Sequence, residues 1–170
     1  HAFELENGEN AWTFTAGGRV DAPPTYWKGL LLFGCRDGWV YCLRAADGEL
    51  AWRFRDLPNR RMGAFAQLES VWPVHGNVLV KDGIAYFAAG RSSFVDGGVF
   101  LYGLNPRTGS VVHSRRIYGP FQEKTGFPAV KNQGCRADVL VSDGELIYMR
   151  HKAFNPDLSD AQSASPHIIP

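Results

Sequence analysis

Short apolar and aromatic runs, separated by Asp-Gly or Thr-Gly, recur along this chain and constrain its fold more than any other feature. The first unit contains LLLFGC (30–35), WVYCL (39–43) and ELAWRF (49–54), and the second contains IAYFAAG (84–90), GVFLYGL (98–104) and SVVHSRR (110–116). A third unit begins at Asp138, continues with ELIYMR (145–150) and loses the pattern after His151. Equivalent landmarks keep one spacing, because Tyr41 and Tyr102 are 61 residues apart and so are Gly83 and Gly144. A constant spacing of this kind indicates structural repeats.

Each repeat is predicted to be a meander of about four antiparallel strands. Asp-Gly between apolar runs favours a tight hairpin, because glycine takes up positive φ without steric strain. The first strands are expected at 22–26, 77–80 and 138–141, within units of about 12–56, 72–120 and 130–170. Such meanders are the blades of a β-propeller, so we predict an all-β partial propeller of about three units, the last one incomplete.

The stretch from Asp37 to Trp52, DGWVYCLRAADGELAW, resembles the PQQ-like propeller repeat. That family includes quinoprotein alcohol dehydrogenases and outer-membrane-assembly proteins of the BamB type, and the resemblance covers residues 12 to about 150. It implies that the closing tryptophan docks between neighbouring blades. Trp52 matches this position, Trp12 matches it in the preceding unit, and His113 replaces it in the second unit.

Composition and charge narrow the classes of partner. The chain is 45% hydrophobic and 21% charged with a net charge of +1, which is typical of a soluble domain and predicts neither nucleic-acid binding nor membrane insertion. It begins at His1 without a methionine, so we expect a fragment of a longer protein. Because few blades leave exposed apolar faces and open edges, the expected partners are remaining blades, another polypeptide or a second copy.

The three cysteines are expected to be small buried residues. A hairpin centred on Asp37-Gly38 would place Cys35 opposite Val40 and Cys42 opposite Phe33. The two thiols would then share a face diagonally, with Cα atoms roughly 7–8 Å apart, which exceeds comfortable disulfide geometry.

The resemblance also raises the question of a cofactor. In the dehydrogenases, PQQ stacks between a tryptophan and a disulfide of adjacent cysteines, beside calcium and a catalytic aspartate. This chain has no adjacent cysteines, and Asp37, Asp47, Asp82 and Asp143 stand in turns, so we expect no cofactor here; PQQ with calcium would belong to other blades. His75, His113, His151 and Cys135 lack local metal-binding spacing, so no metal site is predicted either.

The best candidate for a binding site is the long loop of the second unit together with the segment that leads into the third. Long loops in compact β domains are often functional. The candidate residues for a ligand or partner are Arg91, Ser92, Ser93, Phe94 and Asp96, joined by Arg136 and Asp138, which the sequence suggests as a charged pair.

These observations favour a non-catalytic recognition or scaffolding module in a larger, periplasmic or extracellular protein. Two alternatives are part of a quinoprotein oxidoreductase, which would need adjacent cysteines in flanking sequence, and a carbohydrate-active propeller. The latter would need paired carboxylates facing a channel, and no such pair stands out in the sequence.

Overall fold

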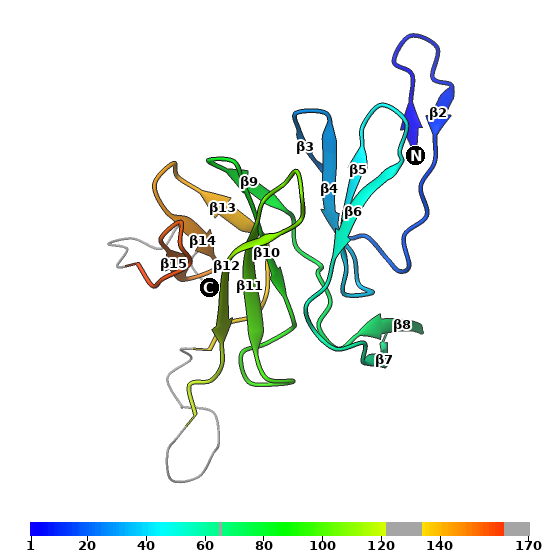
Figure 1. Cartoon of the computed structure of the whole chain (residues 1–170). Coiled ribbons are helices and arrows are strands. Elements are labelled where there is room, and N and C mark those ends of the chain that lie inside the picture. The colour runs from blue at the N-terminus through cyan, green and yellow to red at the C-terminus, as the bar shows by residue number, and fades with distance from the viewer. Residues whose placement is uncertain (65, 122–133, 162–170) are drawn as a thin grey trace.

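The computed structural model describes residues 1–64, 66–121 and 134–161, all of them in strands, turns and loops. Five small antiparallel sheets follow one another along the chain (Figure 1). Within the described residues no helix is present that could cross a membrane.

Two four-stranded meanders form the centre of the molecule. The first contains β3 (Thr25–Trp27), β4 (Leu30–Gly34), β5 (Val40–Arg44) and β6 (Leu50–Phe54). The second contains β9 (Leu79–Lys81), β10 (Ile84–Ala89), β11 (Val99–Leu104) and β12 (Val111–Ile117). Tyr41 and Tyr102 lie in β5 and β11, the third strand of each sheet, so the predicted repeat is confirmed.

The remaining sheets are smaller. A hairpin of β1 (Ala2–Phe3) and β2 (Asn10–Trp12) precedes the first meander, and β7 (Arg61–Ala64) pairs with β8 (Gln67–Ser70) between the two meanders. The third unit has β13 (Leu140–Ser142), β14 (Ile147–Met149) and β15 (Lys152–Phe154).

Strand bounds differ from the predictions in two places. The first strands begin two or three residues later than expected, at Thr25, Leu79 and Leu140; in the first unit, Pro23 and Pro24 have no N–H to donate to a sheet. The third repeat does not end at His151, because β14 turns tightly into β15. Residues 130–133 and 162–170 of the predicted third unit lie outside the described residues.

The predicted pairing around Asp37-Gly38 is wrong by one residue. Gly34 pairs with Val40 and Leu32 with Cys42, and the Cys35 N–H donates to the Trp39 carbonyl at 3.0 Å. The loop therefore contains three residues, 36–38, and Gly38 has φ of 89°. This shift places Cys35 and Cys42 on opposite faces of the sheet rather than on one face. Both thiols are buried and free, as expected, and so is Cys135.

Successive sheets pack face to face through shared cores. The core between the first and second meanders contains Leu32, Cys42, Phe87 and Tyr102. A second core joins the second meander to the third sheet through residues such as Leu101, Ile147 and Phe154. Each blade therefore buries its apolar face against its neighbour.

Trp12 on β2 and Trp52 on β6 each dock onto a turn of the next meander. Trp52 Nε1 donates to the Pro106 carbonyl at 3.0 Å, and a methyl group built on Gly109 would lie 2.9 Å from its ring. Trp12 repeats this arrangement, with its Nε1 3.1 Å from the Ala45 carbonyl and its ring against Gly48. Only glycine allows both the positive φ of these turns and the close approach of the indole.

Beside the apolar core between the second meander and the third sheet, the docking position holds His113 and the contacts to the next turn are polar. Tyr86 donates to the Pro156 carbonyl at 2.8 Å, and Arg115 Nη1 donates to the Leu158 carbonyl at 2.8 Å. No indole docks onto the turn that follows β15. This turn carries Leu158 where the other two turns carry glycine, and the Leu158 side chain is buried.

A buried carboxylate ties the loops of the first two sheets together. Glu69, on β8, is 2% exposed and accepts from Arg36 at 2.8 Å and from Arg91 at 3.1 Å. Arg36 belongs to the β4–β5 loop and Arg91 to the β10–β11 loop. Glu69 therefore pairs with one arginine from each blade, and Asp21 supplies Arg36 with a second carboxylate.

We expect Trp52→Ala to lower the free energy of unfolding by about 3 kcal/mol, because it removes a half-buried indole and leaves a cavity. Thermal unfolding should show a drop of roughly 6–12 °C in Tm. Tyr26→Ala, which removes a ring that is 66% exposed, is the control and should change Tm little. An unchanged Tm for Trp52→Ala would contradict the docking role.

Glu69→Gln should also destabilise the protein, by roughly 3 kcal/mol, because it leaves the partly buried Arg91 without a counter-charge and Arg36 with Asp21 alone. Urea unfolding measures the loss. Asp82→Asn is the matched control, since it removes a carboxylate that is 75% exposed and asparagine tolerates the left-handed backbone of that turn. Equal midpoints for the two variants would show that the Glu69 pairs do not join the blades.

Candidate functional site

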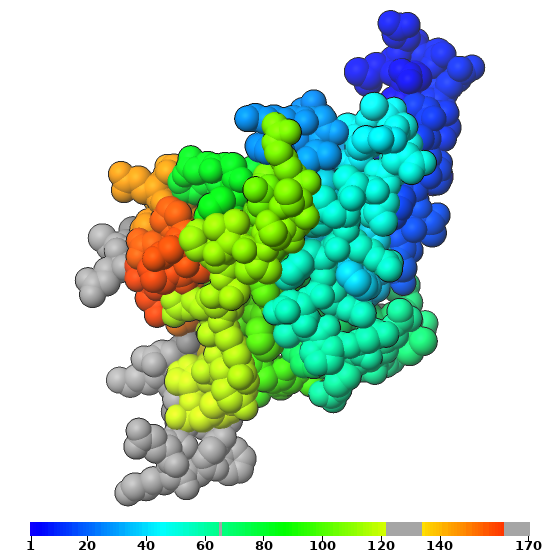
Figure 2. All heavy atoms as spheres, viewed as in Figure 1, coloured from blue at the N-terminus to red at the C-terminus, as the bar shows by residue number. Residues whose placement is uncertain are grey.

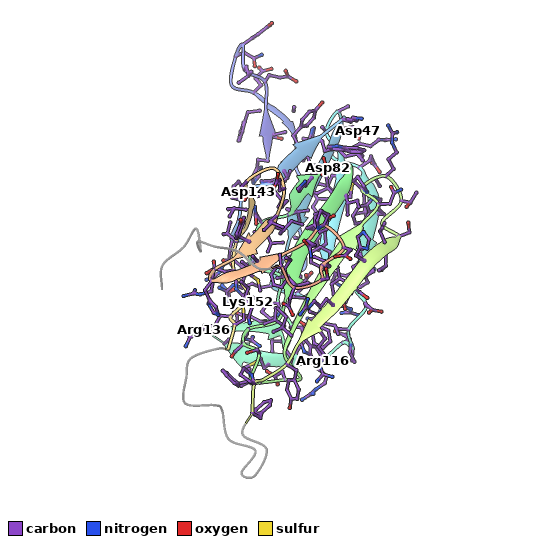
Figure 3. The ribbon with its side chains drawn as sticks, turned by 90° about the vertical axis from the view of Figure 1, so that its left-hand side faces the viewer. Asp47, Asp82, Arg116, Arg136, Asp143 and Lys152 are labelled. Atoms are coloured by element: carbon purple, nitrogen blue, oxygen red, sulfur yellow. The ribbon has the colours of Figure 1, made fainter. Side chains whose placement is uncertain are left out.

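The loops that follow the second and fourth strands of each unit meet at one end of the blades. Figure 3 shows Arg116, Arg136 and Lys152 towards this end, and Asp47, Asp82 and Asp143 at the opposite end. We call the first end the loop end and the second the turn end. The predicted candidate residues all belong to segments of the loop end.

The long β10–β11 loop is fixed by hydrogen bonds to the segment that precedes β13. Ser93 is fully buried; its N–H donates to the Cys135 carbonyl at 2.7 Å, and its hydroxyl accepts from the Cys135 N–H at 2.9 Å. The Arg91 carbonyl accepts from the Ala137 N–H at 3.2 Å. The loop therefore has a defined position against the third unit.

A cavity of about 570 Å³ lies between this loop and the β14–β15 turn. Its lining residues are Ser92, Phe94, Gly134, Cys135, Arg136, Arg150 and His151. The Phe94 ring packs so closely on Gly134 that a methyl group there would lie 2.0 Å from a ring carbon. Glycine at 134 thus lets the aromatic ring form one wall.

The structure brings three of the predicted residues together at this cavity and assigns structural contacts to the other four. Ser92, Phe94 and Arg136 line it. Arg91 binds Glu69 and the Val71 carbonyl, and Ser93 bonds Cys135.

The other two predicted residues have contacts of a different kind. The backbone carbonyl of Asp96 accepts from Trp72 Nε1 at 2.7 Å, while its side chain is exposed. Asp138 pairs with Arg150 at 2.8 Å rather than with Arg136, so the predicted pair is wrong. Arg136 is exposed and has no ion pair with any residue that the structure describes.

Sequence reasoning missed Arg150 and, as a binding residue, His151. Arg150 is the first residue of the two-residue turn between β14 and β15 and has φ of 56°. In the second unit, the connection between the second and third strands is the long β10–β11 loop, which lies at the loop end. Arg150 and His151 form the equivalent connection in the third unit. Extending the repeat past His151 would therefore have placed both residues at the loop end.

His151 lines the cavity and has an unsatisfied polar atom. Its Nε2 is buried and has no hydrogen-bond partner among the described residues. Burial lowers the pKa of His151, and the charges of Lys152 and Arg150 lower it further. The ring is therefore neutral near pH 7.

The cavity thiol is not activated. Burial raises the pKa of Cys135 to about 11, against the opposing effects of Lys152 and Arg150. Because the thiolate is the nucleophile, Cys135 is unreactive at neutral pH.

The described residues do not fit a PQQ site of the dehydrogenase kind. Cys35 and Cys42 lie on opposite faces of one hairpin, and Cys135 belongs to the core of the other two sheets, so no two thiols can form the stacking disulfide. Among the residues that the structure describes, no three histidine, cysteine or acidic side chains are grouped as metal ligands.

Comparison with solved structures supports the propeller fold. The chain is similar to BamB from Moraxella catarrhalis, with a TM-score of 0.51 and 13% identity over 87% of this chain and 37% of that one. It is also similar to quinohemoprotein alcohol dehydrogenase from Comamonas testosteroni, with a TM-score of 0.51 and 20% identity over 68% of this chain and 18% of that one. The chain thus spans well under half of either protein.

No curated protein matches the sequence. The sequence profile of one family, described as outer membrane protein assembly factor BamB, matches residues 1–153. This match covers most of the chain and agrees with the repeat, the docked tryptophans and the fold. The chain therefore belongs to the BamB family of PQQ-like propeller proteins.

Proposed function

We propose that this chain is a non-catalytic recognition module whose loop-end cavity receives a carboxylate-bearing group of a polypeptide partner. The observation that carries the proposal is the combination of Arg136, Arg150 and His151 around one cavity. Arg136 uses none of its five N–H donors for a described residue, and Arg150 uses one nitrogen for Asp138. Guanidinium groups match the planar geometry of a carboxylate.

The same cavity lacks the arrangement that hydrolytic chemistry needs. Its thiol is held protonated, and its described lining residues include no carboxylate. A glycosidase would need two carboxyl groups across the substrate. Phe94 adds an apolar wall, so the cavity suits an acidic group that follows an apolar side chain.

We propose a scaffolding role for the open face of the first meander. A second hollow of about 430 Å³ is lined there by apolar residues that include Trp12, Phe14, Leu31 and Phe33. Burial of such a surface is favourable by about 25 cal/mol per Å². A blade of the same longer protein fits this surface best, and a second copy is the alternative.

The family description refers to assembly of outer membrane proteins. We accordingly propose that the module acts in the periplasm or outside the cell. An absorbance spectrum of the intact protein would test the quinoprotein alternative, because bound quinone absorbs where the protein does not.

For the cavity, we expect the dipeptide Ac-Phe-Glu-NH2 to bind and Ac-Phe-Gln-NH2 to bind at least about fivefold more weakly, because only the first carries a charge for the arginines. Two-dimensional NMR of the intact protein should show shifts at Ser92, Gly134 and His151. Arg136→Gln should abolish the preference for glutamate.

Arg107→Gln, at the turn end, is the matched control and should leave the preference intact. Equal binding of both dipeptides, or shifts confined to other residues, would contradict the proposed role of the cavity.

For the open face, light scattering of the 170-residue chain should show association that grows with concentration and persists at 0.5 M salt, because apolar contacts are not screened. Leu31→Glu should weaken it, and Val111→Glu, at a position that is already 48% exposed, should not. A compact monomer at high concentration would contradict the scaffolding role.

A further inference from the structure

Four arginines without described carboxylate partners are clustered at the end of the first meander and directly after it. Arg53, Arg55, Arg60 and Arg61 fall within nine residues, and none has an ion pair with a described residue. The one acid among them, Asp56, accepts a hydrogen bond from the Tyr102 hydroxyl at 3.1 Å. This contrasts with Arg36 and Arg91 nearby, which are ion-paired with Asp21 and Glu69.

Two of these arginines are held in place by stacking. The guanidinium carbons of Arg53 and Arg55 each lie 4.4 Å from the centroid of the Trp39 ring. Arg55 also donates to the Asn59 side chain at 3.0 Å. Stacking uses the flat face of a guanidinium group and leaves its in-plane N–H groups free to bind an anion. Less side-chain entropy is then lost when a ligand binds.

The other two arginines stand where the β7–β8 hairpin projects from the molecule. Arg60 and Arg61 are exposed at the start of β7, and Arg60 also lies 5.7 Å from the Trp72 ring. Figures 1 and 2 show this hairpin at the loop end, below the first meander. We define the arginine surface as Arg53, Arg55, Arg60 and Arg61 with Trp39.

We propose that the arginine surface binds an acidic segment of a partner polypeptide. This second site is separate from the cavity. It lies around the connection between β6 and β7, whereas the cavity lies between the β10–β11 loop and the β14–β15 turn. Carboxylates are favoured over nucleotide bases or lipid tails because Trp39 already contacts two guanidinium groups. Its ring is then poorly placed to stack on a base or to enter a bilayer.

The charge of the arginine surface supports this choice of partner. Its four guanidinium groups carry positive charge, and none of them is ion-paired with a carboxylate of a described residue. An acidic segment would be attracted to this uncompensated positive charge.

The test measures fluorescence anisotropy of a labelled octapeptide of alternating Glu and Asp, titrated with the intact protein in 50 mM salt. We expect binding that weakens as salt is raised. Arg53→Gln/Arg55→Gln should weaken it at least about fivefold, since two charge-assisted contacts are lost. Arg53→Lys/Arg55→Lys should restore it only in part, because lysine does not present the planar donor pair.

Arg60→Gln/Arg61→Gln is a second variant on exposed positions and should also weaken binding. The matched control is Arg44→Gln/Arg107→Gln at the turn end, which removes the same charge and should leave affinity unchanged. Arg136→Gln should have no effect either, so failure of this inference and failure of the cavity proposal are distinguishable.

Several results would overturn the inference. One is that the octapeptide does not bind in 50 mM salt. Another is that the turn-end control variant loses as much affinity for the octapeptide as Arg53→Gln/Arg55→Gln does. Tighter binding to vesicles of phosphatidylglycerol, or to a single-stranded oligonucleotide, would identify another class of partner. Self-association that is lost in Arg53→Gln/Arg55→Gln would show that an acidic segment of a second copy is the occupant.

Discussion

The packing of an indole against a glycine at the next turn is the contact on which the arrangement of the blades depends. Trp12 meets Gly48 and Trp52 meets Gly109, and each indole also donates to a carbonyl of the same turn. This contact sets the spacing between consecutive sheets and closes a shared apolar core. Where His113 replaces the tryptophan, Leu158 occupies the turn and polar contacts from Tyr86 and Arg115 join the sheets.

Much of the fold follows from the sequence, because a repeat spacing and Asp-Gly turns are local features. Tyr41 and Tyr102 fall in equivalent strands as predicted. The pairing of Cys35 was missed because Asp-Gly fits both a two-residue and a three-residue loop. In the candidate site, Ser92 and Phe94 were predicted from loop length, and Arg136 from its place in the segment that leads into the third unit. The pairing of Asp138 with Arg150 depends on a turn that the repeat pattern alone did not reveal.

The net charge of the whole chain does not show how its charged residues are distributed. A net charge of +1 predicted no strong field, but four arginines that pair with no described carboxylate fall within residues 53–61. The loop end then carries two features for which we propose anion binding, the cavity around Arg136 and the arginine surface around Trp39.

Recognition of a polypeptide partner at the loop end is the central proposal, and hydrogen-exchange mass spectrometry of the intact protein tests it most directly. Exchange would be followed with and without the acidic octapeptide. We expect slower exchange in residues 53–61, with no change in the turns at 45–49 and 105–109. Protection of those turns, or no protection anywhere at saturating peptide, would contradict recognition at the loop end.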